Sequence, residues 1–167
     1  PAVLGPMARQ TAPVIEQWLL AGDAEGDAFE ALLLRLRRRI GARAREAWGF
    51  ECSLDVYVAS LSSRTVVYKG MVRSEVLAQY YADLRDPRFE VSFAVYHRRF
   101  STNTLPRWPL AQPMRLLGHN GEINTRLGNL NWAKASEASL ADVWGEAADD
   151  LNPVVNPAFS DSANLDA

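Results

Sequence analysis

Residues 98–104 read RRFSTNT and residues 118–125 read GHNGEINT, and these two stretches decide the fold assignment. Within this short span the chain has arginines, small hydroxyls, carboxamides and glycines. A guanidinium group binds a carboxylate through two parallel hydrogen bonds. Amide N–H groups donate to a developing oxyanion. The pattern therefore predicts a polar site for a small zwitterion.

Composition sets the broad class of the protein. The chain has 167 residues, of which 48% are apolar and 23% charged, as expected for one globular domain. A net charge of -2 gives no reason to expect nucleic acid or an anionic membrane as a partner. No apolar run reaches about 18 residues and the first residues lack a signal-peptide pattern, so a cytoplasmic protein is expected.

Cysteine and histidine are scarce. Cys52 is the only thiol, and His97 and His119 are the only histidines. This set gives no metal-ligand cluster of standard spacing, so no metal site is predicted. Cys52 is interpreted as a buried structural residue, since neither histidine is close to it in sequence.

Hydrophobic periodicity predicts a surface helix over residues 27–47. The arginines in this helix could form a nucleic-acid patch, but a solvated face is the preferred interpretation. They are Arg35, Arg37, Arg38 and Arg39. The apolar residues between positions 14 and 20 are expected to pack against the domain. The tryptophans are expected in the core or packed in loops, although Trp108 could shape a pocket rim.

Shorter elements follow from local composition. Strands are expected at 54–60 and 65–69, with a turn at 62–64. Further strands are expected at 89–97, which would deliver the arginine motif at its end, and at 114–117. Helices are expected at 76–81, at 122–138 and from about residue 160, where a serine or aspartate would cap the first turn.

Three candidate groups could hold or cut a substrate. Arg99, with Thr102 near it, could bind a carboxylate, although an arginine at a strand end is commonly a surface ion-pair member. Asn120 and Gly121, before the helix expected at 122–138, could form an oxyanion hole or a simple turn. A carboxylate near residue 160 could bind an ammonium group or cap the helix.

Taken together, these motifs resemble the class II (type-2) glutamine amidotransferase domain of the glutamate synthase large subunit. The resemblance is densest over 93–132 and implies that residues 1–167 are part of such a domain. Its implied fold class is α+β, the four-layer αββα sandwich of N-terminal nucleophile (Ntn) hydrolases, incomplete at both ends. The implied chemistry is hydrolysis of glutamine to glutamate and ammonia, which then reaches 2-oxoglutarate.

The resemblance also assigns roles to residues. Arg99 and Thr102 match the segment that binds the carboxylate of glutamine, and Arg98 falls where the family varies. Asn120 and Gly121 match the oxyanion hole. The ammonium-binding carboxylate matches Asp161 best, with Asp166 as a weaker candidate. His119 is interpreted as an orienting or core residue, because the terminal amine of the nucleophile acts as the base in this class.

The nucleophile of the family is an N-terminal cysteine, whereas this chain begins Pro1-Ala2-Val3. The chain alone is therefore expected to be inactive, and whether it acts as an enzyme by itself stays open. No cofactor is expected in this chain. FMN and an iron-sulfur cluster are implied only for the whole oxidoreductase, as are the rest of the large subunit and the small subunit. The alternatives are a glutamine- or glutamate-binding module that does not cut its ligand, and a vestigial fragment.

Overall fold

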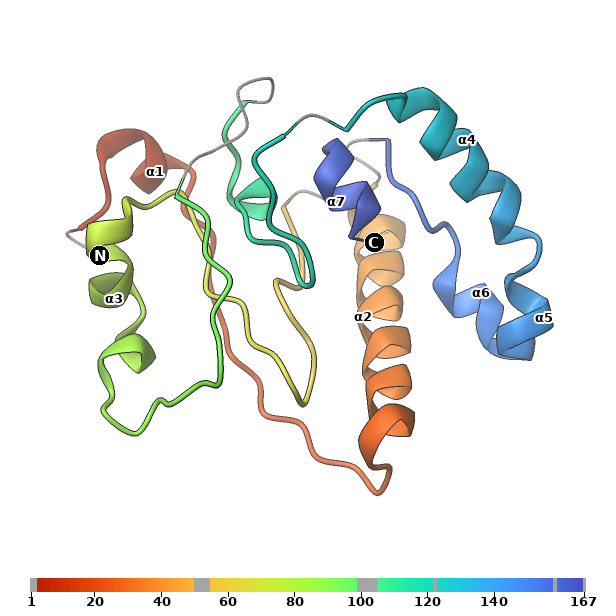
Figure 1. The fold of residues 1–167 in the computed structure, drawn as a ribbon, viewed down its shortest axis with the longest axis horizontal. Helices are drawn as coiled ribbons and strands as arrows, with labels where there is room; N and C mark the ends of the chain where they lie inside the picture. Colours follow the sequence, from red (N-terminus) through yellow and green to blue (C-terminus); the bar gives the residue numbers. More distant parts are fainter. Residues whose placement is uncertain (1–2, 50–54, 99–104, 122, 158, 167) are drawn as a thin grey trace.

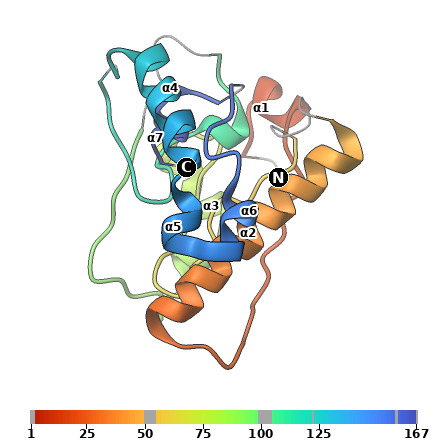
Figure 2. The same ribbon diagram turned by 90° about the vertical axis from the view of Figure 1, so that its right-hand side faces the viewer.

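The computed structural model describes residues 3–49, 55–98, 105–121, 123–157 and 159–166, and the fold is built around one long helix. Figure 1 shows this helix, α2, with α1 and α3 to one side of it and α4, α5 and α6 to the other. Figure 2, turned by 90°, shows α5 and α6 in front of α2, and α6 contacts α2. The helices are α1 (Pro6–Gln10), α2 (Gly26–Trp48), α3 (Leu77–Tyr80), α4 (Arg126–Glu137), α5 (Leu140–Trp144), α6 (Ala148–Leu151) and α7 (Asp161–Leu165).

Helix α2 confirms the periodicity prediction to within one residue at each end. Asp27 lies in its first turn, where a negative charge is favourable near the helix N-terminus. The helix ends at Gly49, whose φ of 86° is easily adopted only by glycine and whose N–H donates to Arg45 O at 2.8 Å. The short helix predicted at 76–81 is also present, as a 3₁₀ turn (Ser74–Val76) followed by α3.

The described residues contain no β-strand, so the αββα sandwich is not confirmed. The turn at 62–64 does form: Ser62 Oγ accepts from the N–H groups of Arg64 and Thr65 at 3.0 and 3.3 Å. Across the turn, Val67 N–H donates to Ser60 Oγ at 3.1 Å, a side-chain acceptor where an antiparallel ladder would use a backbone carbonyl. The turn chemistry was therefore predicted correctly and the strand pairing was not.

Two other predicted strands also differ. Residues 91–96 have no regular secondary structure, Phe93 and Tyr96 are 78% and 80% exposed, and no described segment pairs with them as a strand. Residues 114–117 form a tight turn in which Met114 N–H donates to Leu117 O at 2.7 Å. A strand requires a neighbouring backbone in register, and neither segment has one in the part of the chain that the structure describes.

A small apolar cluster holds the α1 side of the molecule together. Trp108 is 3% exposed and packs with Leu4 and Ala8, while Tyr57, Met71, Val72 and Tyr80 surround them. Trp108 is thus a core residue, not a pocket rim. The prediction that the apolar residues at 14–20 pack against the domain is wrong. Val14 and Leu19 are 90% and 93% exposed, because no described element covers this connection to α2.

Gly70 is expected to tolerate no side chain. A Cβ there would lie 2.5 Å from Cζ3 of the buried Trp108 ring. Overpacking of this kind costs about 1–3 kcal/mol, so Gly70→Ala should lower the thermal unfolding midpoint. Gly41→Ala is the matched control, because its Cβ would be 3.5 Å from Arg45 Nη1 and alanine is favoured in a helix by about 1 kcal/mol. Equal midpoints for the two variants would contradict the packing at Trp108.

The arginine-rich part of α2 is only partly solvated, which corrects that interpretation: Arg39 is exposed, whereas the other three arginines are half-buried. Arg35 Nη2 and Arg39 Nε lie 2.8 and 2.6 Å from the two carboxylate oxygens of Asp150, and so tie α2 to α6. Arg37 and Arg38 are half-buried and line a cavity. These contacts with other segments are absent from a helical wheel.

Candidate active site

The loop 118–123 and helix α7 form the candidate site, because they bring together residues far apart in the sequence. Ser160 caps α7 as predicted, its Oγ accepting from Ala163 N–H at 3.2 Å. Asp161 then begins the helix, and its Oδ2 accepts from Ile123 N–H at 3.2 Å. This hydrogen bond places the predicted ammonium-binding carboxylate beside the predicted oxyanion loop.

Asp161 is held as an ionised acceptor. Its Oδ1 accepts from Ser162 N–H at 2.6 Å and from Ser162 Oγ at 3.1 Å. Burial by itself would raise the pKa of Asp161, but the hydrogen bonds from the N–H groups of Ser162 and Ile123 outweigh it and hold the pKa below its ordinary value. A carboxylate has about four acceptor positions. Three are used here, and the remaining one, on Oδ2, could accept from an ammonium group.

His119 links the loop to Asp161. Gly121 N–H donates to His119 Nδ1 at 3.1 Å, so Nδ1 carries no proton in this arrangement. His119 Nε2 must then donate to Ser162 Oγ, 2.7 Å away. The Ser162 hydroxyl in turn donates to Asp161 Oδ1. The result is a continuous chain of hydrogen bonds from Gly121 through His119 and Ser162 to Asp161. This arrangement agrees with the interpretation of His119 as a residue that orients its neighbours.

The Asn120-Gly121 pair lies further from a helix than predicted. Helix α4 begins at Arg126 and not at residue 122, because Thr125 adopts a left-handed φ of 55° just before it. The dipole of α4 is therefore not aimed directly at Asn120 and Gly121, since the effect falls off within the first turn. Asn120 is exposed, and its carboxamide has no hydrogen bond to another described residue. Its N–H groups could therefore turn toward a ligand.

Asp166, the weaker candidate, has a structural role. Its Oδ2 accepts from Arg115 N–H and Nε–H, each at 3.1 Å, and its Oδ1 accepts from Leu116 N–H at 2.7 Å. Arg115 Nη2 also donates to the Asp166 carbonyl oxygen. The Asp166 side chain is only 5% exposed, and both of its oxygens are taken by backbone and side-chain donors of residues 115 and 116. The geometry thus favours Asp161 as the group that meets a substrate.

Arg99 and Thr102 lie outside the described residues. The neighbouring Arg98 is described: its Nη2 is 3.1 Å from Glu75 Oε1, and its side chain is 66% exposed. Arg98 is therefore a surface ion-pair member, in agreement with the interpretation that it is solvated. Cys52 also lies outside the described residues.

Sequence reasoning missed two residues that support the loop. Gln112 Oε1 accepts from His119 N–H at 2.9 Å and so fixes the start of the loop. Ser162 contacts both His119 and Asp161. A serine next to the candidate Asp161 was a local signal for Ser162, but nothing in the sequence indicated Gln112.

The described part of the chain has neither a metal-binding cluster nor a membrane-spanning helix. No three histidine, cysteine, aspartate or glutamate side chains in this part of the chain are grouped so that they could hold a metal ion. None of its helices combines the length and apolar character needed to cross a membrane.

Comparison with known proteins identifies the family. The profile of class II glutamine amidotransferases matches residues 1–167. The chain is 51% identical to a ferredoxin-dependent glutamate synthase of Cyanidium caldarium, over 99% of this chain and 11% of the relative. It is 52% identical to ferredoxin-dependent glutamate synthase 1 of Arabidopsis thaliana, over 99% of this chain and 10% of the relative. It is 47% identical to the NADPH glutamate synthase large chain of Azospirillum brasilense, over 98% of this chain and 11% of the relative.

The chain thus spans about a tenth of the length of the curated relatives that it matches. The match covers the RRFSTNT and GHNGEINT stretches together with the helix that carries Asp161. The chain belongs to the class II glutamine amidotransferase family.

Proposed function

We propose that this chain is part of the glutaminase domain of a glutamate synthase, which hydrolyses glutamine to glutamate and ammonia for transfer to 2-oxoglutarate. The observation that carries the proposal is the contact between Asp161 and the 118–123 loop. It joins an ionised carboxylate to the segment that contains Asn120 and Gly121. The relatives, which are glutamate synthases, support the choice of parent enzyme.

Each recognition element of glutamine has a candidate partner. Asp161 accepts from the ammonium group through the remaining position on Oδ2. Arg99 binds the α-carboxylate bidentately, and Thr102 adds a hydroxyl hydrogen bond. Holding both ends of the zwitterion fixes the side-chain amide relative to the nucleophile, which lowers the entropic part of the barrier.

Asn120 and Gly121 stabilise the tetrahedral intermediate. When a thiolate attacks the amide carbon, the carbonyl oxygen becomes negatively charged and is stabilised by preorganised N–H donors. Asn120 supplies a carboxamide N–H and Gly121 a backbone N–H. The Gly121 N–H points to His119 Nδ1 in this arrangement. During the reaction this N–H must therefore share its hydrogen bond with the oxyanion or turn from His119 to the oxyanion.

The nucleophile in this family is an N-terminal cysteine, and residues 1–167 contain only Cys52. A polypeptide limited to these residues does not hydrolyse glutamine, since an oxyanion hole without a nucleophile retains only a small part of the rate enhancement. In the glutaminase domain, the segments predicted as strands are paired in the sheets of the Ntn-hydrolase sandwich.

The remaining machinery belongs to the rest of the large subunit and, where present, a small subunit. An iron-sulfur cluster requires several thiolate ligands, and this chain has one cysteine. The cluster is therefore placed outside the chain, and FMN is likewise assigned to the synthase part of the enzyme. The protein is assigned to the cytoplasm, and this compartment stays a prediction.

Substitution of Asp161 tests the proposal. Asp161→Asn in the full-length protein keeps the size of the side chain and removes its charge. We expect KM for glutamine to rise about tenfold, the worth of one charge-assisted hydrogen bond, while kcat changes less. The measurement is glutamate formation from glutamine at increasing substrate concentrations.

Asp142→Asn is the matched control, because Asp142 is exposed on α5 and outside the site. An Asp161→Asn variant with the KM of this control would assign Asp161 to capping alone. A full-length protein that binds glutamine without forming glutamate would instead be the non-catalytic binding module.

A further inference from the structure

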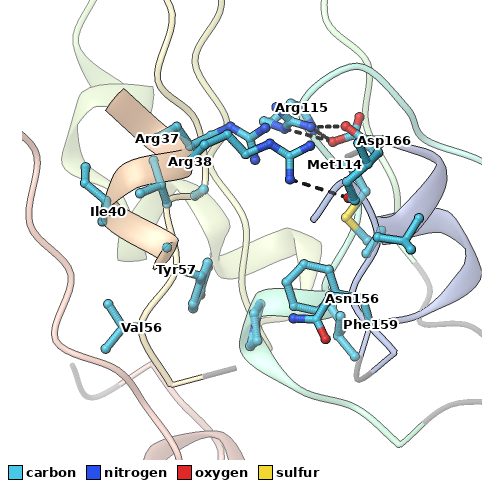
Figure 3. Close-up of a pocket in the computed structure, with 18 of the residues that line it drawn as sticks. Arg37, Arg38, Ile40, Val56, Tyr57, Met114, Arg115, Asn156, Phe159 and Asp166 are labelled. Carbon is cyan, nitrogen blue, oxygen red and sulfur yellow. Dashed lines mark hydrogen bonds and ion pairs between the residues drawn. The ribbon is translucent and has the colours of Figure 1, made fainter. Parts of the chain in front are cut away.

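A cavity of about 130 Å³ lies between α2 and α7 and is lined by residues of both helices. Figure 3 shows that side chains of α2 reach into it from one wall and those near Met114 and Asp166 from the other. Segment 56–59 and segment 153–156 contribute to its remaining walls. Neither Asn120, Gly121 nor Asp161 lines the cavity. It is therefore a separate feature of the molecule.

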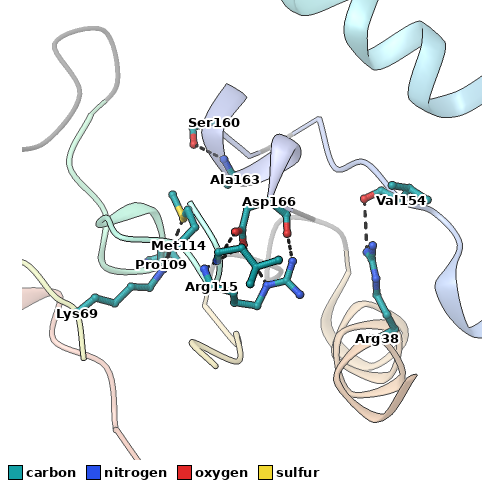
Figure 4. A network of polar contacts seen from close by, with 10 residues as sticks. Arg38, Lys69, Pro109, Met114, Arg115, Val154, Ser160, Ala163 and Asp166 are labelled. Atoms are coloured by element: carbon teal, nitrogen blue, oxygen red, sulfur yellow. Dashed lines mark hydrogen bonds and ion pairs between the residues drawn. The ribbon is translucent and has the colours of Figure 1, made fainter. Parts of the chain in front are cut away.

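The cavity walls carry an excess of positive charge. The cationic residues are Arg37, Arg38, Arg45, Lys69 and Arg115, and the acidic residue is Asp166. The Asp166 carboxylate is already used by Arg115 and by the backbone N–H of Leu116. Figure 4 shows Asp166 turned toward Arg115, while Arg38 reaches toward the Val154 carbonyl. Asp166, together with Glu137, which attracts Arg38, leaves a net positive charge on this set.

Two of the arginines have buried nitrogen atoms without partners. Arg37 Nε and Nη2 and Arg38 Nε are buried, and none has a hydrogen-bond acceptor among the described residues. A buried polar group without a partner costs about 1–3 kcal/mol, and a charged group costs more. Such a group requires an explanation, and an ion or water molecule that the protein chain does not supply is one that fits this cluster of cations.

The acid–base behaviour of the cluster agrees with this geometry. Burial lowers the pKa of Arg37 to about 9 and that of Arg38 to about 10, and Arg115 adds repulsion to both. Burial also lowers the pKa of Lys69 to about 8. Lys69 Nζ has neutral partners, the Pro109 carbonyl at 2.8 Å and Met114 Sδ at 3.8 Å. A bound anion would offset burial at all three groups.

We propose that this cavity binds a compact oxyanion, held by the guanidinium groups of Arg37 and Arg38 with Lys69 facing it. An engineered apolar cavity of about 150 Å³ accommodates benzene, a molecule of six heavy atoms. A cavity of 130 Å³ therefore matches an anion of about that size. A guanidinium group binds phosphate and carboxylate oxygens with the same planar geometry. Either a phosphate or a carboxylate could therefore supply the oxygens that the arginines bind.

The site has a structural consequence for α7. Ala163 of this helix and Asp166 at its end line the cavity, and Asp161 at its start accepts from Ile123 N–H of the 118–123 loop. An anion in the cavity would bridge α2 to the α7 wall and neutralise repulsion between Arg37 and Arg115. Binding is therefore expected to stabilise the protein by mass action.

The test is thermal unfolding and calorimetry of the full-length protein with inorganic phosphate or with oxalate, at ionic strength held constant by chloride. We expect saturable binding and a higher unfolding midpoint than in chloride alone. Tighter binding of phosphate would identify a phosphoryl group as the ligand, and tighter binding of oxalate a carboxylate.

Variants on α2 separate the cavity from general charge effects. Arg37→Gln should weaken binding about tenfold or more, the loss of one charge-assisted hydrogen bond. Arg37→Lys should retain part of the affinity, because it keeps the charge but loses the planar fork. Arg43→Gln is the matched control on the same helix. Arg43 is exposed, pairs with Glu46 at 2.8 Å and does not line the cavity.

Three outcomes would overturn the proposal. The first is a wild-type protein that gains no stability in phosphate or oxalate beyond the chloride control. The second is equal weakening by Arg37→Gln and Arg43→Gln, which would indicate nonspecific charge. The third is a folded Arg37→Lys variant whose anion affinity equals that of the wild type, since this would show that the Arg37 guanidinium group takes no part.

Discussion

Replacing Asn120 with alanine is expected to lower kcat for glutamine hydrolysis by about 100- to 1000-fold and to leave KM nearly unchanged. The Asn120 carboxamide is exposed, in the same loop whose Ile123 N–H donates to Asp161. It has no hydrogen bond to a described residue, so it is available to the reacting oxygen. Charge develops on that oxygen only in the transition state. Loss of the donor therefore costs about 3 kcal/mol there and little in the ground state.

The measurement is steady-state hydrolysis of glutamine by the full-length protein. Asn131→Ala is the control, because Asn131 is an exposed carboxamide on α4 that lies outside the loop. It should leave both kinetic constants near their wild-type values. An unchanged kcat in the Asn120→Ala variant would reduce Asn120-Gly121 to an ordinary turn, the alternative that the sequence left open.

Replacing Arg99 with lysine is expected to weaken glutamine binding by about 1.5–3 kcal/mol, or roughly 10- to 100-fold. Lysine keeps the positive charge but cannot form the two parallel hydrogen bonds of a guanidinium group with a carboxylate. Arg98 provides the matched comparison within the same motif. It pairs with Glu75 on the surface, and Arg98→Lys should be almost silent because exposed ion pairs contribute little.

Calorimetric titration of the full-length variants with glutamine compares the two substitutions directly. A large loss for Arg99→Lys with wild-type affinity for Arg98→Lys would support a specific carboxylate site. Equal losses from both would mean that residues 98 and 99 act as a general basic patch, and the assignment of Arg99 would be wrong.

The sequence alone determined the features that depend on near neighbours in the chain. The spacing of apolar residues predicted helix α2, and Ser160 marked the start of α7. Serine side chains also specified the turn at 62–64. The motifs led to the family, which the comparison confirmed over residues 1–167. In each case the determining interactions lie within a few residues, so the pattern is visible in the sequence itself.

Only the tertiary structure decided which side chains meet. The sequence offered both Asp161 and the weaker Asp166 as candidates, and the structure shows that Asp161 reaches Ile123 whereas Asp166 is closed off by Arg115. These contacts join residues 38 and 51 positions apart. The arginine run of α2 looked solvated because a helical wheel shows one helix, whereas burial depends on the segments that pack against it. The sequence could not settle strand pairing, which is missing among the described residues, because a ladder needs a second backbone in register and its presence is a property of the whole fold.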